Sequence, residues 1–214
     1  MMKKTVLASL LTLASGAAMA NGFYAGIGAG GMDFNNDQTV TTVSDHTSTI
    51  TATDQGNVGI NGTVFAGHAW VFQDKLFLAL EAFGDYTSAK VTNETTVNGA
   101  KTTDLKTQLN YVYGARVLPG YKLTTETDAY VILGVARANV KVTDAGSNSS
   151  NYYFNGAQMG VGTMTELTHN LGLRGDIIYT GYKNQTIHGS DAANTVKMQL
   201  ATLEGDVSLV YTFG

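Results

Sequence analysis

Residues 202–213, at the end of the chain, read TLEGDVSLVYTF and alternate between two kinds of side chain. Leucine, glycine, valine and two aromatic residues occupy one parity, whereas threonine, glutamate, aspartate and serine fill most of the other. Successive side chains of a β-strand point to opposite faces. The stretch therefore predicts a strand with one apolar and one mostly polar face, as found both in soluble sheets and in membrane barrels.

The N-terminus carries the signature of an exported protein. Two lysines precede an apolar run over residues 6–14, and an Ala-Met-Ala triplet ends at Ala20. A charged segment, a short apolar segment and a small-residue cleavage site form a secretory signal peptide in this order. The apolar run is too short to span a bilayer as an anchor. We predict a cleaved signal peptide over 1–20 and one domain over 21–214.

The composition excludes several classes of protein. The chain has no cysteine, which removes disulfide and thiolate-metal sites. Only 14% of the residues are charged and the formal net charge is −4, which argues against nucleic acid as a partner. No stretch after the N-terminal leader approaches the length of about 18 apolar residues that a transmembrane helix needs.

The alternating pattern recurs along the rest of the mature chain. Strand-like segments are joined in turn by long polar segments and by short turns, as in outer-membrane barrels. We predict four surface loops, over residues 32–56, 90–103, 143–153 and 185–195. The predicted fold class is all-β, an eight-stranded antiparallel up-and-down transmembrane β-barrel. A soluble barrel with the faces reversed remains the alternative, and the signal peptide and the aromatic residues near strand ends favour the membrane.

The C-terminal strand resembles the assembly signal of bacterial outer-membrane β-barrels, in which a polar residue, a small residue and two aromatic residues recur. The matching positions are Asp206, Ser208, Tyr211 and Phe213. Ser208 stands where glycine is usual, and Gly214 follows the last aromatic residue.

The mature chain as a whole resembles the small outer-membrane barrels typified by OmpA, OmpX and Ail-type proteins, with a porin-family barrel domain. The resemblance covers nearly all of residues 21–213, but its motifs are general to the architecture. It implies an integral protein of the Gram-negative outer membrane, surrounded by lipid and lipopolysaccharide and inserted by the barrel-assembly machinery. It implies the fold rather than a particular activity.

Strand parity assigns one set of side chains to lipid and a charged set to the lumen. The outward set includes Leu80, Leu109, Tyr111, Tyr113, Tyr130, Ile132 and Val207. An eight-stranded barrel is only wide enough for its own side chains, and buried charges must be paired. We predict a structural ion-pair network that plugs the lumen, with a proton or ion pathway as the alternative. Its members are Glu81, Asp85, Arg116, Arg137, Lys141, Glu166, Arg174, Asp176, Glu204 and Asp206.

A row of glycines near the start of the mature chain has two interpretations. Gly26-x-Gly28 is also found in phosphate-binding loops, but the preceding strand and following helix that such a loop requires are missing. We predict instead that Gly26, Gly28 and Gly30 face the lumen and leave room for longer side chains opposite.

Two motifs raise the question of catalysis or metal binding. His188-Gly189-Ser190 resembles the His-x-Ser of outer-membrane lipid A deacylases, but a serine nucleophile needs a nearby base and a third group to orient it. The predicted register places Glu204 in the lumen and His188 in a loop, so the three do not meet. Asp33-x-Asn35-x-Asp37 matches the start of an EF-hand loop, but the turn glycine and the bidentate glutamate are replaced. We predict no catalytic residue, no cofactor and no dedicated metal site.

The predicted function is that of a non-enzymatic surface barrel with a plugged lumen. It acts structurally, through adhesion, or through another surface interaction of its four extracellular loops, because loops on rigid scaffolds commonly carry function. The alternatives are a lipid A-modifying enzyme and a narrow channel.

Overall fold

The computed structural model of this chain describes residues 21–44, 47–72, 75–97, 100–144, 149–188 and 194–213. The predicted signal peptide lies outside them. Ten strands form one sheet: β1 (Gly22–Ser44), β2 (Thr47–Phe72), β3 (Leu76–Thr87), β4 (Lys90–Val97), β5 (Ala100–Lys122), β6 (Thr127–Asp144), β7 (Ser149–Thr168), β8 (Leu171–Tyr182), β9 (Gln185–His188) and β10 (Asn194–Phe213). No helix in the described part of the chain is long and apolar enough to cross a membrane.

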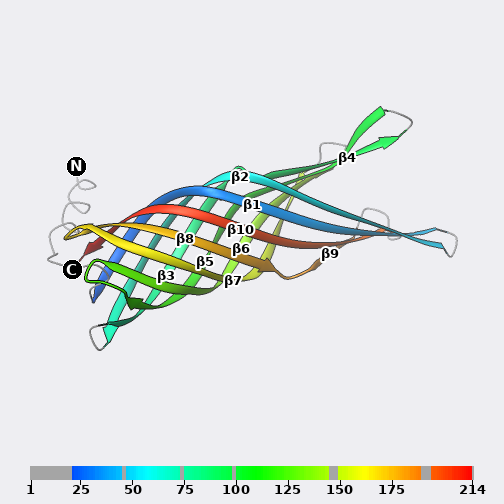
Figure 1. The fold of residues 1–214 in the computed structure, drawn as a ribbon. Coiled ribbons are helices and arrows are strands. Elements are labelled where there is room, and N and C mark those ends of the chain that lie inside the picture. The colour runs from blue at the N-terminus through cyan, green and yellow to red at the C-terminus, as the bar shows by residue number, and fades with distance from the viewer. Residues whose placement is uncertain are drawn as a thin grey trace, which may run out of the picture.

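The sheet closes on itself as a barrel (Figure 1). β4 pairs with β5 beyond the end of β3, and β9 pairs with β10 beyond the end of β8. Each of these short strands thus continues its predecessor, and eight strands surround the lumen. β10 pairs with β1 from Phe23↔Phe213 to Thr42↔Asn194. This last pairing removes the open sheet edge, which could not be tolerated in hydrocarbon, and the predicted fold class is confirmed.

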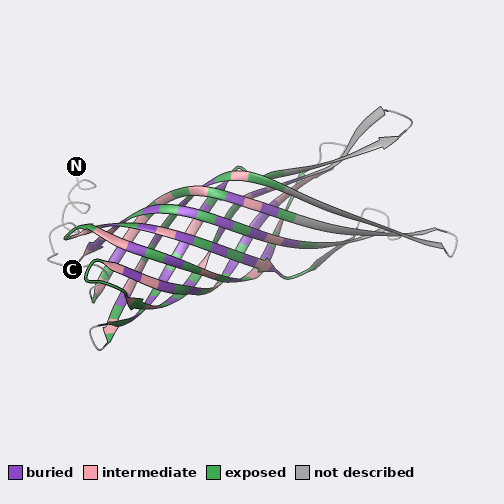
Figure 2. Ribbon diagram, in the orientation of Figure 1, coloured by how far each residue is buried: buried purple, intermediate pink, exposed green. Residues whose placement is uncertain are grey.

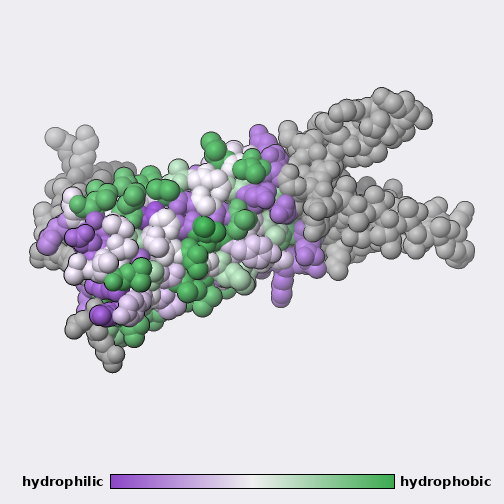
Figure 3. Space-filling view, in the orientation of Figure 1, coloured by the Kyte–Doolittle hydropathy of each residue, from purple (hydrophilic) through white to green (hydrophobic). Residues whose placement is uncertain are grey.

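The alternation along each strand places apolar side chains outside and polar or charged side chains inside. On β10, Val207 is 60% exposed, whereas Glu204 and Asp206 are buried. On β3, Leu78 and Leu80 are exposed, whereas Glu81, which follows Leu80 on the same strand, is buried. Figure 2 shows this alternation of buried and exposed positions around the barrel, and Figure 3 shows apolar side chains on its outer surface. The soluble barrel with an apolar interior face and a charged exterior is therefore wrong.

One strand faces the opposite way from the prediction. On β6, Tyr130, Ile132 and Val140 are buried in the lumen, whereas Val131 and Leu133 are exposed. Both parities of this strand are apolar near its start, so the alternation by itself was ambiguous there. The predicted outward position of Ile132 is wrong.

A β-bulge in β5 explains why a second residue faces the opposite way from the prediction. The pairing with β6 shifts between Leu109↔Val140 and Tyr111↔Asn139, which leaves Asn110 as the extra residue. A bulge reverses the parity of the residues beyond it. Leu109 is therefore buried, although Tyr111 and Tyr113 on the same nominal parity are exposed as predicted.

The predicted loops also need correction, because the strands run far into them. β1 and β2 contain 23 and 26 residues, whereas a barrel strand crosses a bilayer with about 9–11 residues. The backbone of β1 and β2 is paired as far as Ser44↔Thr47. The first predicted loop is thus a long hairpin, and β4 and β5 form another that projects from the same end of the barrel (Figure 1). Thr- and Val-rich segments of this kind favour strands.

Candidate functional site: the charged lumen

The carboxylate of Glu81 on β3 lies at the centre of the buried charges. It accepts a hydrogen bond from Arg116 Nε at 2.5 Å and from Arg174 Nη1 at 2.5 Å. The hydroxyl of Tyr24 on β1 donates to it at 2.9 Å. Glu81 thus joins side chains from four strands, and its negative charge is compensated by two guanidinium groups.

Arg174 on β8 extends this cluster through a second carboxylate. Its Nε donates to Asp176 Oδ2 at 2.7 Å, and Tyr130 on β6 donates its hydroxyl to Asp176 Oδ1 at 2.7 Å. Arg174 is 1% exposed. Each end of its guanidinium therefore meets a carboxylate, and the side chain is fixed in the middle of the barrel.

Aromatic rings enclose the two arginines. The Cζ atom of Arg174 lies 4.4 Å from the ring centre of Phe65, and that of Arg116 lies 4.6 Å from the ring centre of Phe83. Guanidinium groups stack favourably on aromatic faces. The rings exclude water from the ion pairs and fill the width of the lumen beside them.

A second polar cluster lies nearer to the end from which the long hairpins project. Asn61 on β2 donates from Nδ2 to Glu204 Oε1 at 2.5 Å and to Asp206 Oδ1 at 2.8 Å, both on β10. Asp85 on β3 is buried as well. The Oδ1 atom of Asn61 has no hydrogen-bond partner among the residues that the structure describes. Six carboxyl groups and two guanidinium groups are buried in the described part of the chain, so acids outnumber bases in the lumen: Glu81, Asp85, Asp128, Asp176, Glu204, Asp206, Arg116 and Arg174.

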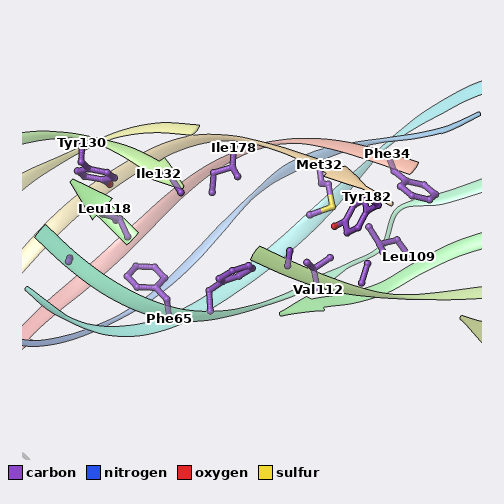
Figure 4. Packing of buried hydrophobic residues seen from close by; sticks show 14 of the residues in the cluster. Met32, Phe34, Phe65, Leu109, Val112, Leu118, Tyr130, Ile132, Ile178 and Tyr182 are labelled. Atoms are coloured by element: carbon purple, nitrogen blue, oxygen red, sulfur yellow. The ribbon is translucent and has the colours of Figure 1, made fainter. Parts of the chain in front are cut away.

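Apolar side chains close the lumen on both sides of the charges. Leu118 and Tyr130 lie toward the end that holds the short turns (Figure 4). Met32, Phe34 and Leu109 lie toward the hairpin end, and each is at most 1% exposed. The described residues therefore form apolar, ionic and apolar layers inside the lumen, and we refer to these layers as the plug.

The glycine row of β1 faces this plug as predicted. A Cβ atom on Gly26 would collide with the ring of Phe65, and one on Gly30 would collide with the Asp206 carboxylate. The absence of side chains on β1 thus makes room for large side chains of β2 and β10.

The structure places the ten predicted lumen residues in three groups. Glu166 is half-buried at the turn end of β7, where the register with β8 shifts, and is outside the central cluster. Arg137 is exposed on the outer face of β6, because that part of the strand faces opposite to the prediction, so its assignment to the lumen is wrong. Lys141 is half-buried near the hairpin end of β6 and is outside the central cluster. The remaining seven are buried inside: Glu81, Asp85, Arg116, Arg174, Asp176, Glu204 and Asp206.

Tyr24, Tyr130 and Asp128 are buried polar residues that were not among the predicted lumen set. Tyr24 shares the parity of the glycine row, which is a signal in the sequence for its inward position. Tyr130 was assigned to the wrong face of β6, and Asp128 to a turn that ends two residues earlier in the structure. Both face inward, and Tyr130 contributes a hydrogen bond to the network.

The remaining predicted positions belong to the assembly signal on β10 and to the two motifs considered for catalysis and metal binding. Asp206 and Ser208 are buried, while the half-exposed rings of Tyr211 and Phe213 meet edge to face with centroids 5.0 Å apart. Their role as an assembly signal stays a prediction.

His188 ends β9 and Ser190 lies outside the described residues, whereas Glu204 is buried in the lumen. Asp33 and Asn35 are part of β1, so the EF-hand-like motif begins on a strand rather than in a loop.

Comparison with known proteins agrees with the geometry. The family model of the outer membrane protein beta-barrel domain matches residues 5–213. No curated protein matches the chain. The solved structure of Neisserial surface protein A (NspA) has a TM-score of 0.51 at 15% identity, over 89% of this chain and 97% of that one.

Two other solved structures are similar at the same level. The outer membrane protease OmpT from Escherichia coli has a TM-score of 0.53 at 8% identity, over 95% of this chain and all 100% of its own. The outer membrane protein OprG from Pseudomonas aeruginosa has a TM-score of 0.50 at 15% identity, over 93% of this chain and 97% of its own. Likeness at these identities shows the barrel fold alone.

Proposed function

The chain belongs to the outer membrane protein β-barrel family, and from this premise we propose that it is a non-enzymatic surface barrel that binds an extracellular partner through its projecting hairpins. As an integral outer-membrane protein it exposes one end of the barrel to the medium. Barrels of this class place their short turns in the periplasm and their long connections outside. The partner is a host ligand, a neighbouring protein or a glycan.

The length of the β1–β2 hairpin is the observation that carries this proposal. Its two strands hold more than twice the residues needed to cross the bilayer. Because they remain paired almost to the tip, the hairpin offers a long pre-ordered ribbon to a partner. Pre-ordering lowers the entropic cost of binding.

The plugged lumen supports the same proposal from inside. Arg174 and Glu81 meet across the interior, and apolar layers lie on both sides of them. A barrel filled in this way offers little space for a dissolved substrate. The surface that remains available for interaction is the outside.

Excision of the hairpin tests the proposal. Residues 38–53 are replaced by a two-residue Asn-Gly turn, which connects paired strands tightly, and cells that express either form are assayed for adherence to host cells and matrix. The expected result is a barrel that still shows heat-modifiable mobility on gels but no longer supports adherence. Unchanged adherence of the folded variant would contradict the proposal.

The enzymatic alternative has its own measurement. Lipid A is extracted from cells that express the wild type, His188→Ala or Ser190→Ala, and its acyl chains are counted by mass spectrometry. A non-enzymatic barrel leaves the acyl pattern the same in all three. An acyl chain removed only by the wild type would establish the deacylase.

The excess of buried carboxyl groups favours a second candidate function, a narrow cation pathway. Asn61, Glu204 and Asp206 form a polar cluster with more acids than bases nearby. Rings of carboxylates favour cations in channels. Small cation-selective currents from purified protein, abolished by Glu204→Gln, would support this candidate.

A further inference from the structure

The outer face of the barrel carries a polar cross-strand row near the hairpin end. Tyr113 on β5 pairs with Arg137 on β6, and Arg137 pairs with Asn155 on β7. The backbone nitrogen of Lys183, just after β8, donates to the carbonyl oxygen of Asn155 at 2.8 Å. All four side chains are exposed. Since neighbouring strands lie about 4.8 Å apart, the backbones of Arg137 and Lys183 are separated by about 10 Å across Asn155.

This row lies at the boundary of the apolar band. Two residues closer to the short turns, the paired outward positions are Ala115, Val135 and Ala157. Beyond them come Val117, Leu133 and Met159, which are all exposed apolar side chains. A step of two residues along a strand is about 6.7 Å. On β6 and at the end of β8, Arg137 and Lys183 therefore follow these exposed apolar positions on the side of the hairpins.

Tyrosines surround Arg137. Its guanidinium lies 4.8 Å from the ring centre of Tyr153, and the hydroxyl of Tyr153 lies 3.4 Å from that of Tyr111. The ion pairs of the buried cluster join Arg116 and Arg174 to carboxylates, and Arg137 is not part of that cluster. Stacking on Tyr153 holds one face of the exposed guanidinium, and its N–H edges can donate to an anion.

We propose that Arg137, Asn155 and Lys183 form a binding site for a phosphate group of the phosphorylated glycolipid of the outer leaflet. Arginine pairs with phosphate through two parallel N–H donors, and lysine contributes a point charge from the other side of the row. The amide of Asn155 lies between them and donates to the same group or to the sugar. Lys141, two rows further out on β6, adds positive charge toward the outer part of the headgroup.

The geometry favours this ligand over other lipids. The row lies above the apolar band, so the acyl chains of the ligand run down along Val135 and Leu133 while its phosphate meets the cations. Tyrosines at this depth are typical of the membrane interface. The site is independent of the hairpin function proposed above, because it is on the lipid-facing wall.

Lipid titration of the folded mature barrel in a zwitterionic detergent tests the site. Native mass spectrometry measures the apparent Kd for bis-phosphorylated lipid A, for lipid A without phosphates, and for phosphatidylglycerol. We expect the wild type to bind bis-phosphorylated lipid A at least about tenfold more tightly than either other lipid, which corresponds to about 1.4 kcal/mol. Arg137→Gln with Lys183→Gln should abolish this preference.

Lys75→Gln supplies the matched control. Lys75 is exposed and lies 6.0 Å from the ring centre of Tyr121, at the turn end of the barrel. The same chemical change there should leave the lipid A affinity as in the wild type. An equal loss in Lys75→Gln, an unchanged affinity in the double variant, or equally tight binding of phosphatidylglycerol would overturn the proposal. Should the double variant fail to fold, equal binding of phosphate-free lipid A by the wild type would overturn it as well.

Discussion

Arg174 on β8 donates from Nη1 to Glu81 Oε2 on β3 at 2.5 Å, although β8 and β3 lie on opposite sides of the barrel. In the closed ring of eight, three strands separate them in either direction. A single ion pair thus spans the interior. It links the two halves of the wall by a contact that sheet hydrogen bonds do not provide.

Removal of Arg174 should destabilise the barrel strongly. Arg174→Ala leaves Glu81 and Asp176 with less compensation in a poorly hydrated site, and breaking a buried pair costs about 3–5 kcal/mol. Denaturant unfolding in lipid vesicles measures the change. Arg137→Ala is the control, because the side chain of Arg137 lies on the outer face and its loss should cost less than about 1 kcal/mol. Equal losses for both variants would contradict the plugged lumen.

The filled lumen predicts that the purified protein is not a general porin. Planar-bilayer recordings of the wild type should show no stable current on the porin scale, because ion pairs and apolar layers occupy the interior. Glu81→Ala combined with Arg174→Ala removes the central link and should increase the frequency of openings. Large steady currents from the wild type would refute this expectation.

A charged substitution on the lipid-facing wall should destabilise the barrel by an amount that depends on its depth in the membrane. Val207 is exposed on β10, well inside the apolar band, so Val207→Arg should destabilise by about 2–4 kcal/mol. Val58 on β2 is likewise exposed and outward but near the hairpin end, and Val58→Arg should cost about 0–1 kcal/mol. The comparison uses vesicle unfolding curves. A Val207→Arg barrel as stable as the wild type would place this face away from lipid.

Glycines on the two faces should respond differently to a methyl group. A Cβ atom on Gly162 would collide with Asp176 Oδ1 and the ring of Tyr130. Gly162→Ala should therefore destabilise by about 1–3 kcal/mol through overpacking. Gly84 faces outward, with the nearest atom of Val64 at 4.0 Å, so Gly84→Ala should be neutral or stabilising by up to about 1 kcal/mol. The midpoint of unfolding should separate the two variants.

The orientation of the barrel can be read with single cysteines, since the chain contains none. A membrane-impermeant maleimide should label Ser44→Cys, near the tip of the β1–β2 hairpin, in intact cells. Thr124→Cys lies in the turn between β5 and β6 and should be labelled only after the outer membrane is permeabilised. Labelling in the reverse order would invert the topology.

The sequence predicted the architecture because period-two alternation persists over eight segments. On β3, β8 and β10, charged residues occupy one parity and large apolar residues the other, so the facing of these strands followed directly. Six lumen charges lie on these three strands, and Arg116 on β5 could be placed in the same way. The signal at the N-terminus and the aromatic C-terminal strand assigned the apolar face to lipid.

Where the pattern was degenerate, only the closed barrel decided. Near the start of β6 both parities are apolar, and its facing follows from pairing with β5 and β7 on either side. The bulge at Asn110 shifts the register of β5, and no alternation within one strand reveals an extra residue in its pairing. The outward position of Arg137 and the inward position of Leu109 both depend on these neighbours.

The sequence by itself determined a barrel with a polar interior, because most strands carry an alternation that shows which face meets lipid. The pairing of the charges was decided by tertiary structure. Glu81 and Arg174 are 93 residues apart, and they meet only because closure of β1 on β10 fixes the diameter of the barrel. That diameter is a property of all eight strands together, and it sets which side chains are long enough to reach across.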